Sequence, residues 1–223
     1  MMEDILVDSK RPHYLIDAVF EWKYGNGAYY ATVILLFIVA LAGLLIRNDI
    51  FRARWAFIAV ALSLLPALCE WIIRIRFPWP MKFLLTLALL MHMAGGIFLF
   101  YFTLYPVYDK VCHLVAAMAI AFLVFISILV PGGLTGRNFR RRAIIACVFI
   151  AVLVLGLAWE YAEFRLDIRS GSTYFVNPLD SVFDMIFNII ATAYMAANFN
   201  EYLKRESLIS LYRRWIHWRG KDS

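Results

Sequence analysis

Residues 108–130 read YDKVCHLVAAMAIAFLVFISILV, and this stretch decides the fold. From Leu114 to Val130 every residue is apolar except Ser127. A helix needs about 20 apolar residues to cross the roughly 30 Å hydrocarbon core of a bilayer. We therefore predict a membrane-spanning helix here, with Asp109 and His113 in its first turns.

Five further stretches have a similar length and composition. They are Ala28–Ile46, Trp55–Ile73, Phe83–Leu104, Ala143–Phe164 and Leu179–Phe199. None alternates polar and apolar residues as a membrane strand does, so helices are the remaining way to satisfy the backbone in lipid. We predict an all-α integral membrane bundle of six transmembrane helices. Its predicted parts are a cytoplasmic N-terminal segment (1–27), the six-helix domain (28–200) and a basic amphipathic cytoplasmic tail (201–223).

The overall composition agrees with a membrane protein. Hydrophobic residues make up 63% of the 223 residues, charged residues only 17%, and the mean hydropathy is +0.72. Soluble domains are about half apolar and a quarter charged. This excludes a soluble enzyme, a disordered tail and a nucleic-acid-binding domain. The net charge of +6 instead suits loops that face anionic lipid, so the expected partner is the bilayer and not nucleic acid.

The basic residues predict the orientation. Six spans put both termini on one side, and that side collects 16 of the 22 Lys and Arg residues. The other side collects Arg47, Arg52, Arg54, Lys110, Arg165 and Arg169. The bias predicts cytoplasmic termini in a multi-pass protein of the cell (plasma) membrane. Near the C-terminus, Leu208, Leu211 and Trp215 among arginines predict an interfacial amphipathic helix on the inner leaflet.

Two smaller predictions concern isolated polar groups. The three cysteines, Cys69, Cys112 and Cys147, lie in apolar surroundings without metal-type spacing, and we expect buried thiols. Glu70 and Arg74 are four residues apart near a helix end, which favours a local ion pair.

Three polar stripes stand out, because ionisable groups within a span cost roughly 2.5 to 3.5 kcal/mol each and are usually functional. The stripes are Asp109 with His113, Glu160 with Glu163, and Asp180 with Asp184 and Asn188. Spacings of three or four residues place each stripe on one helix face. The predicted topology brings the start of the fourth span, the end of the fifth and the start of the sixth to the outer face. We therefore expect the stripes to meet at one depth.

Crowded carboxylates must be protonated or neutralised by cations. Carboxylates with one imidazole suit a divalent metal, such as Zn, Mg, Mn or Fe. The candidate metal ligands are Asp109, His113, Glu160, Glu163, Asp180 and Asp184. Among them, the candidate catalytic groups are His113, Glu160 and Asp184.

Simpler explanations exist for some of these residues. Asp109 and Asp180 stand in the first turn of predicted helices, where an acid interacts favourably with the helix dipole. Arg165 or Arg169 could neutralise the glutamates, or hold an anionic head group above the site. Asn188 and His92 are candidates for contacts to substrate or to the ligands, although His92 could equally bond a neighbouring residue.

The three stripes together resemble a known pattern. Asp109-Lys110-x-x-His113, Glu160-x-x-Glu163 and Asp180-x-x-x-Asp184-x-x-x-Asn188 are similar to elements of the VanZ-like and YjdF-type families of small polytopic membrane proteins. The resemblance covers roughly the second half of the chain. VanZ-like sequences more often have Glu-x-x-Gln at the second element, so the second acid favours the YjdF-type branch. The resemblance implies a link to glycopeptide resistance for some members, but no established reaction.

Three functions remain open from the sequence. The first is a metal-dependent hydrolase or phosphoryl-type transferase acting at the outer leaflet on a lipid or lipid-linked envelope substrate. The second is a transporter or cation-binding protein using the same acids. The third is a scaffold in which Tyr108, Tyr161 and Tyr174 hydrogen-bond to the acids. Below Asn188 the sixth span is nearly apolar, which favours a one-sided site over a transport path.

Overall fold

The computed structural model describes residues 22–170 and 178–218, almost all of them helical. Its helices are α2 (Trp22–Leu45), α3 (Ile50–Ile73), α4 (Trp79–Ile97), α5 (Phe100–Thr103), α6 (Val107–Thr135), α7 (Arg141–Ser170), α8 (Pro178–Arg205) and α9 (Leu208–Trp215). Two short strands, β1 (Ile75–Arg76) and β2 (His217–Trp218), pair antiparallel.

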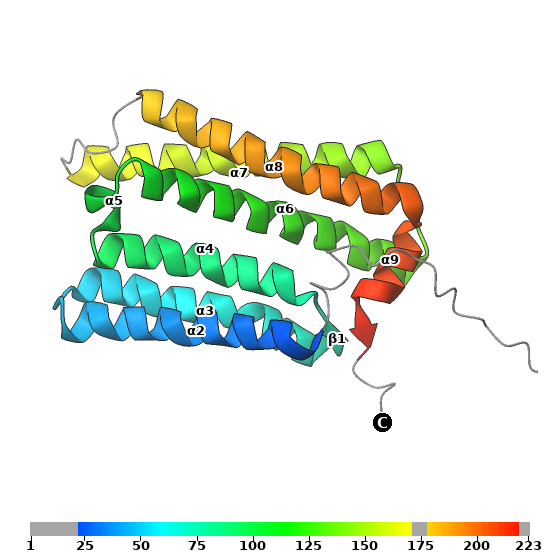
Figure 1. Cartoon of the computed structure of the whole chain (residues 1–223), viewed down its shortest axis with the longest axis horizontal. Helices are drawn as coiled ribbons and strands as arrows, with labels where there is room; N and C mark the ends of the chain where they lie inside the picture. Colours follow the sequence, from blue (N-terminus) through cyan, green and yellow to red (C-terminus); the bar gives the residue numbers. More distant parts are fainter. Residues whose placement is uncertain (1–21, 171–177, 219–223) are drawn as a thin grey trace, which may run out of the picture.

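The six long helices, α2, α3, α4, α6, α7 and α8, are each long and apolar enough to cross a membrane, as predicted. They form two groups of three (Figure 1). In one group α2 packs against α3 and α4, and in the other α8 packs against α6 and α7. The groups meet where α4 contacts α6. The short helix α5 lies at one end of the bundle and α9 at the other, so we call these the α5 end and the α9 end (Figure 1).

The third span ends earlier than the sequence suggested. We expected it to continue to Leu104, but α4 stops at Ile97 and Leu99 adopts a left-handed conformation with φ of 64°. The break was hidden because Phe98, Leu99 and Phe100 are all apolar and carry no stop signal. It allows the chain to turn into α5.

The main core lies where α6, α8 and α9 meet. The rings of Phe125 and Phe199 stack there with centroids 4.1 Å apart, and Trp215 packs edge-on against Phe125. Elsewhere large apolar side chains point outward from the long helices, for example Ile34, Leu62 and Ile150. Such outward-facing surfaces suit hydrocarbon, so a lipid bilayer is the environment that these helices imply.

The tail contains the short helix α9, whose apolar face is covered by protein. Leu208, Leu211 and Tyr212 of α9 are buried, and the helix packs against α6. Beyond it, β2 pairs with β1, which joins the C-terminal segment to the α3–α4 connection. An interfacial position on the inner leaflet stays a prediction, and the apolar face is not free to insert into lipid.

Docking of α9 depends on a close approach at Gly133 of α6. A Cβ atom there would lie 2.0 Å from Cγ of Tyr212, which no side chain can tolerate without movement. We expect Gly133→Ala to destabilise the protein by about 1–3 kcal/mol, the usual cost of overpacking. Thermal unfolding of the full chain in detergent measures this. Gly27→Ala is the control: nothing lies within 4 Å of its Cβ, and a neutral or slightly stabilising effect is expected. Equal stability of both variants would show that α9 docks loosely.

Two of the sequence predictions about isolated polar groups were wrong. Glu70 forms its ion pair with Lys82, at 2.8 Å, and not with Arg74, which caps α3 in a left-handed conformation. The local spacing misled because Lys82 reaches Glu70 from the next helix. Of the cysteines only Cys112 is buried; Cys69 and Cys147 are exposed on helix faces, where apolar surroundings in the sequence reflect lipid and not core.

Candidate functional site

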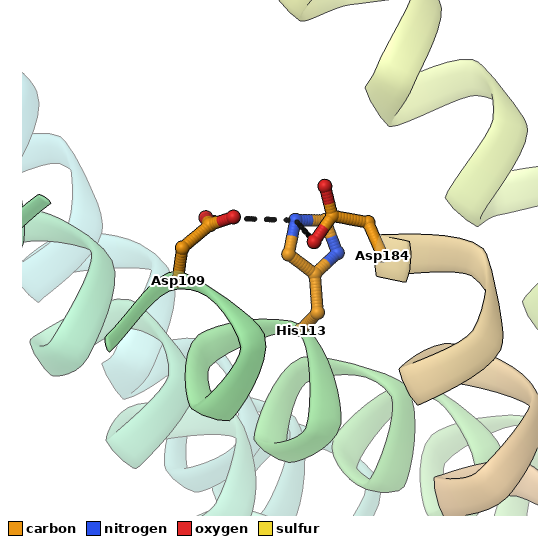
Figure 2. A group of neighbouring side chains, drawn as sticks. All are labelled: Asp109, His113 and Asp184. Atoms are coloured by element: carbon orange, nitrogen blue, oxygen red, sulfur yellow. Dashed lines mark ion pairs between the residues drawn. The ribbon is translucent and has the colours of Figure 1, made fainter. Parts of the chain in front are cut away.

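The three polar stripes meet at the α5 end of the bundle. α6 contributes Asp109 and His113 from its first turns, and α8 contributes Asp184 from its second (Figure 2). α7 runs in the opposite direction and brings Glu160 and Glu163 from its far end. The antiparallel arrangement of three successive helices therefore places residues about 70 positions apart in the sequence within one cluster.

Lys110 lies inside the cluster, a placement that the sequence analysis missed. Its Nζ donates hydrogen bonds to Asp109 Oδ2 at 2.9 Å, Asp180 Oδ1 at 2.5 Å and Asp184 Oδ1 at 2.6 Å. The side chain is only 9% exposed, so these are buried ion pairs. The sequence analysis assigns Lys110 only to the basic residues of the outer side and predicts no contact between it and the acids. Its position between Asp109 and Cys112, inside the span and not before it, was the available signal.

Tyr105 adds a fourth bond to this group. Its hydroxyl donates to Asp180 Oδ1 at 3.1 Å. Desolvation and the neighbouring Asp180 carboxylate raise the pKa of Tyr105, so the phenol stays protonated and able to donate. One ammonium group and one phenol therefore satisfy much of the charge of the three aspartates.

His113 stands between this group and the glutamates. Its Nε2 lies 3.5 Å from Asp184 Oδ1 and 3.8 Å from Asp109 Oδ1, and in Figure 2 dashed lines join this nitrogen to both carboxylates. Glu160 Oε1 lies 3.8 Å from the same Nε2 atom. These distances exceed those of hydrogen bonds, so the carboxylates surround the imidazole without binding it directly.

One carboxylate oxygen of Glu160 lacks a hydrogen-bond partner. Its side chain is 11% exposed, and its Oε1 is buried without a hydrogen-bond partner among the described residues. A buried unpaired polar oxygen is costly and calls for an explanation. Two sets of possible ligand atoms lie within 4.8 Å of one another: one comprises Asp109, His113 and Asp184, the other His113, Glu160 and Glu163. In the first set Lys110 already binds both aspartates, whereas the second contains the unpaired oxygen.

Asn188 is buried on α8, next to α7. Gly156 of α7 makes this approach possible, since a Cβ there would lie 2.9 Å from Nδ2 of Asn188. His92 of α4 faces the same region: its Nδ1 is 2.8 Å from the Tyr101 hydroxyl, and its ring packs edge-on against Trp159. His92 therefore both bonds a neighbour and lines the space beside the site, the two roles that the sequence left open.

The other predicted contributors have no printed contact with the acids of the site among the described residues. Arg165 is exposed, and the side chain of Arg169 is outside the described residues. Of the tyrosines expected to bond the acids, Tyr108 donates to the Met91 carbonyl oxygen at 2.6 Å, Tyr161 is exposed, and Tyr174 is outside the described residues. The residue that fills this role is Tyr105.

A cavity of about 880 Å³ opens beside the site, between the two helix groups. Its wall at the α5 end includes Asp109, His113 and Glu163, and also His92 and Tyr101. From there it follows α6 to Pro131, and the rest of its wall is almost entirely apolar. The polar cluster thus forms one end of a long, otherwise apolar groove.

A protein-family model matches most of the chain. The family described as "Predicted membrane protein (DUF2238)" matches residues 29–205. The chain belongs to this family. The match begins within α2 and ends at the last residue of α8, so it includes every residue of the candidate site and excludes α9. No curated protein and no solved structure is similar enough to match.

Proposed function

We propose that the protein is a divalent-metal-dependent membrane enzyme, with its metal held by His113, Glu160 and Glu163. The unpaired, buried Oε1 of Glu160 carries this proposal, because a cation would supply the missing partner. Imidazole and carboxylate oxygens are ligands for Zn, Mn, Fe or Mg. The sequence also suggested Asp109, Asp180 and Asp184 as ligands. Lys110 neutralises part of their charge, so in this proposal they surround the metal site without binding the metal.

The proposed reaction is a hydrolysis or a phosphoryl-type transfer on a lipid or lipid-linked envelope substrate. A bound divalent metal supplies Lewis acidity and can lower the pKa of a bound water. Within the chain, Asp184 is the candidate catalytic group outside the proposed ligand set, and it would accept or return a proton beside His113, whose Nε2 lies 3.5 Å from Asp184 Oδ1. Asn188 and His92 line the cavity and would contact the substrate. The apolar wall of the cavity favours a lipid over a water-soluble substrate.

We further propose that the α5 end faces the outside of the plasma membrane and that both termini are cytoplasmic. The excess of basic residues at the α9 end supports this orientation. The Glu160-x-x-Glu163 element supports a relation to the YjdF-type branch of the family resemblance.

A transporter is the second candidate, but the described residues that line the cavity toward the α9 end are nearly all apolar. On α8 the next hydroxyl below Asn188 is that of Thr192, which donates to the Asn188 carbonyl at 2.6 Å. Tyr194 points outward from the bundle. On α6, Ser127 donates to the Leu123 carbonyl of its own helix. The cavity is therefore polar at the α5 end alone. This supports an enzyme that works at one membrane surface.

Metal analysis of the purified full chain tests the proposal. We expect elemental analysis to find about one divalent metal per chain. In Glu160→Gln and His113→Gln the affinity for the metal should fall at least about tenfold, because even the loss of a residue that only supports a ligand has an effect of this size. Glu201→Gln, on the exposed part of α8, is the matched control and should retain the metal. Wild-type protein without metal, and with no difference from Glu160→Gln on titration with Zn²⁺ or Mn²⁺, would refute the metal site.

The reaction is tested with the same preparations. Wild-type protein mixed with a bacterial envelope lipid extract should release a product that requires metal and is missing with Glu160→Gln. Metal flux into liposomes without lipid turnover would contradict the enzyme and support the transporter.

A further inference from the structure

The connection between α6 and α7 carries a dense group of positive charges. α6 ends at Thr135, Gly136 caps it in a left-handed conformation, and α7 begins at Arg141. This connection lies at the α9 end of the bundle, opposite the candidate site (Figure 1). Four arginines, all exposed, stand within residues 137–142 and are called the arginine cluster below: Arg137, Arg140, Arg141 and Arg142.

The acids at this end of the bundle are already paired with other cations. Glu201 pairs with Lys204 at 2.5 Å and with Arg205 at 3.9 Å, and Glu206 pairs with Arg214 at 2.9 Å. Among the described residues, no carboxylate oxygen lies within ion-pair distance of the arginine cluster.

The start of α7 adds to this positive charge. Its first turn contains no acid, although the dipole of a helix makes its N-terminal end positive and favours acids there. Neighbouring charges of the same sign repel one another. The connection therefore has an excess of positive charge that a bound anion would neutralise.

Two large apolar side chains are exposed beside the arginine cluster. Leu134, in the last turn of α6, is 56% exposed, and Phe139, between Arg137 and Arg140, is 48% exposed. Both stand at the end of a helix that is long and apolar enough to cross a membrane. A free phosphate ion or an acidic peptide would leave these side chains in water, whereas the upper part of a lipid chain would cover them.

We infer that the α6–α7 connection binds an anionic phospholipid, with the phosphate at the arginine cluster and the chains against Leu134 and Phe139. A guanidinium group suits this role because it can donate two parallel hydrogen bonds to one phosphate. This interaction surface lies at the opposite end of the bundle from His113 and Glu160. It is independent of the proposed metal and of the proposed reaction.

Native mass spectrometry of the full chain in detergent, titrated with single lipids, tests the inference. We expect phosphatidylglycerol to bind at least about tenfold more tightly than phosphatidylcholine, and this preference to weaken at high salt. Arg140→Gln/Arg142→Gln should lower the affinity for phosphatidylglycerol roughly 25-fold, because each basic residue near an anionic lipid contributes about fivefold.

Arg47→Gln/Arg54→Gln is the matched control. It removes the same charge from two arginines that are also exposed but belong to the opposite end of the bundle. The affinity of this variant for phosphatidylglycerol should equal that of the wild type. Phe139→Ser keeps every charge of the arginine cluster and should weaken the binding of phosphatidylglycerol severalfold.

Three results would overturn the inference. Equal affinities of the wild type for phosphatidylglycerol and phosphatidylcholine would show that the phosphate charge is not recognised. Unchanged affinity in Arg140→Gln/Arg142→Gln would place the lipid elsewhere. Displacement of the lipid by an equal concentration of inorganic phosphate or of a glutamate peptide would show that the surface accepts any anion.

Metal content, measured on the same samples, separates this inference from the proposed function. Arg140→Gln/Arg142→Gln should contain as much metal as the wild type. Selective binding of phosphatidylglycerol by a protein without metal would support the lipid surface and refute the metal site. A bound metal without lipid selectivity would refute the lipid surface alone.

Discussion

Replacing Lys110 by Met should destabilise the folded protein by about 3–5 kcal/mol, the usual cost of removing one partner from a buried ion pair. The ammonium group holds Asp109, Asp180 and Asp184 at 2.9 Å or less, and all four side chains are buried. Without it, three carboxylates from two helices face one another with Tyr105 as the remaining donor to Asp180. Repulsion would then act directly between α6 and α8. Thermal unfolding in detergent measures the loss.

Two further variants make this test specific. Lys204→Met removes an exposed ammonium that pairs with Glu201 at 2.5 Å, and exposed pairs contribute at most about 1 kcal/mol. The triple variant Lys110→Met/Asp180→Asn/Asp184→Asn removes two of the unpaired charges together with the ammonium and should recover part of the loss. A Lys110→Met protein as stable as Lys204→Met would show that the aspartates are compensated in another way.

The six spanning helices could be predicted from the sequence because their length and apolar composition are properties of consecutive residues. Residues 108–130 predicted α6, and the structure extends that helix to Val107–Thr135. The end of α4 was missed for the same reason: Leu99 breaks the helix within an apolar run, where the conformation depends on packing of the following turn and not on a local signal.

The site was predictable in part. Spacing placed Asp109 and His113 on one face, and the alternation of span direction predicted that acids from α7 and α8 would meet them. What the sequence did not provide was the pairing inside the cluster. Lys110 follows Asp109 directly, and neighbours in a helix point in different directions, so spacing alone gave no reason to place its ammonium among aspartates of α8. A long flexible side chain reaches them nonetheless.

The second large effect is expected at the opposite end of the bundle. Lys82 is 1% exposed, and its Nζ pairs with Glu70 Oε1 at 2.8 Å. The same oxygen accepts the Phe77 backbone N–H at 2.7 Å, and the ammonium lies over the Tyr29 ring, 5.2 Å from its centroid. This one pair therefore joins α2, α3, α4 and the connection between α3 and α4. We expect Lys82→Met to cost about 3–5 kcal/mol, because it leaves the Glu70 carboxylate buried without its cation.

A double-variant cycle separates the charge from the packing. Glu70→Gln/Lys82→Met keeps an acceptor for the Phe77 N–H and removes both charges, so it should be more stable than Lys82→Met alone, as neutral replacements of buried pairs often are. Equal stability of the two would show that the loss comes from packing around Tyr29. The metal content of folded Lys82→Met should equal that of the wild type, because Lys82 and Glu70 lie far from the α5 end. This result would distinguish the two groups: the Glu70–Lys82 pair stabilises the bundle, whereas substitutions of His113 and Glu160 should lower the metal content.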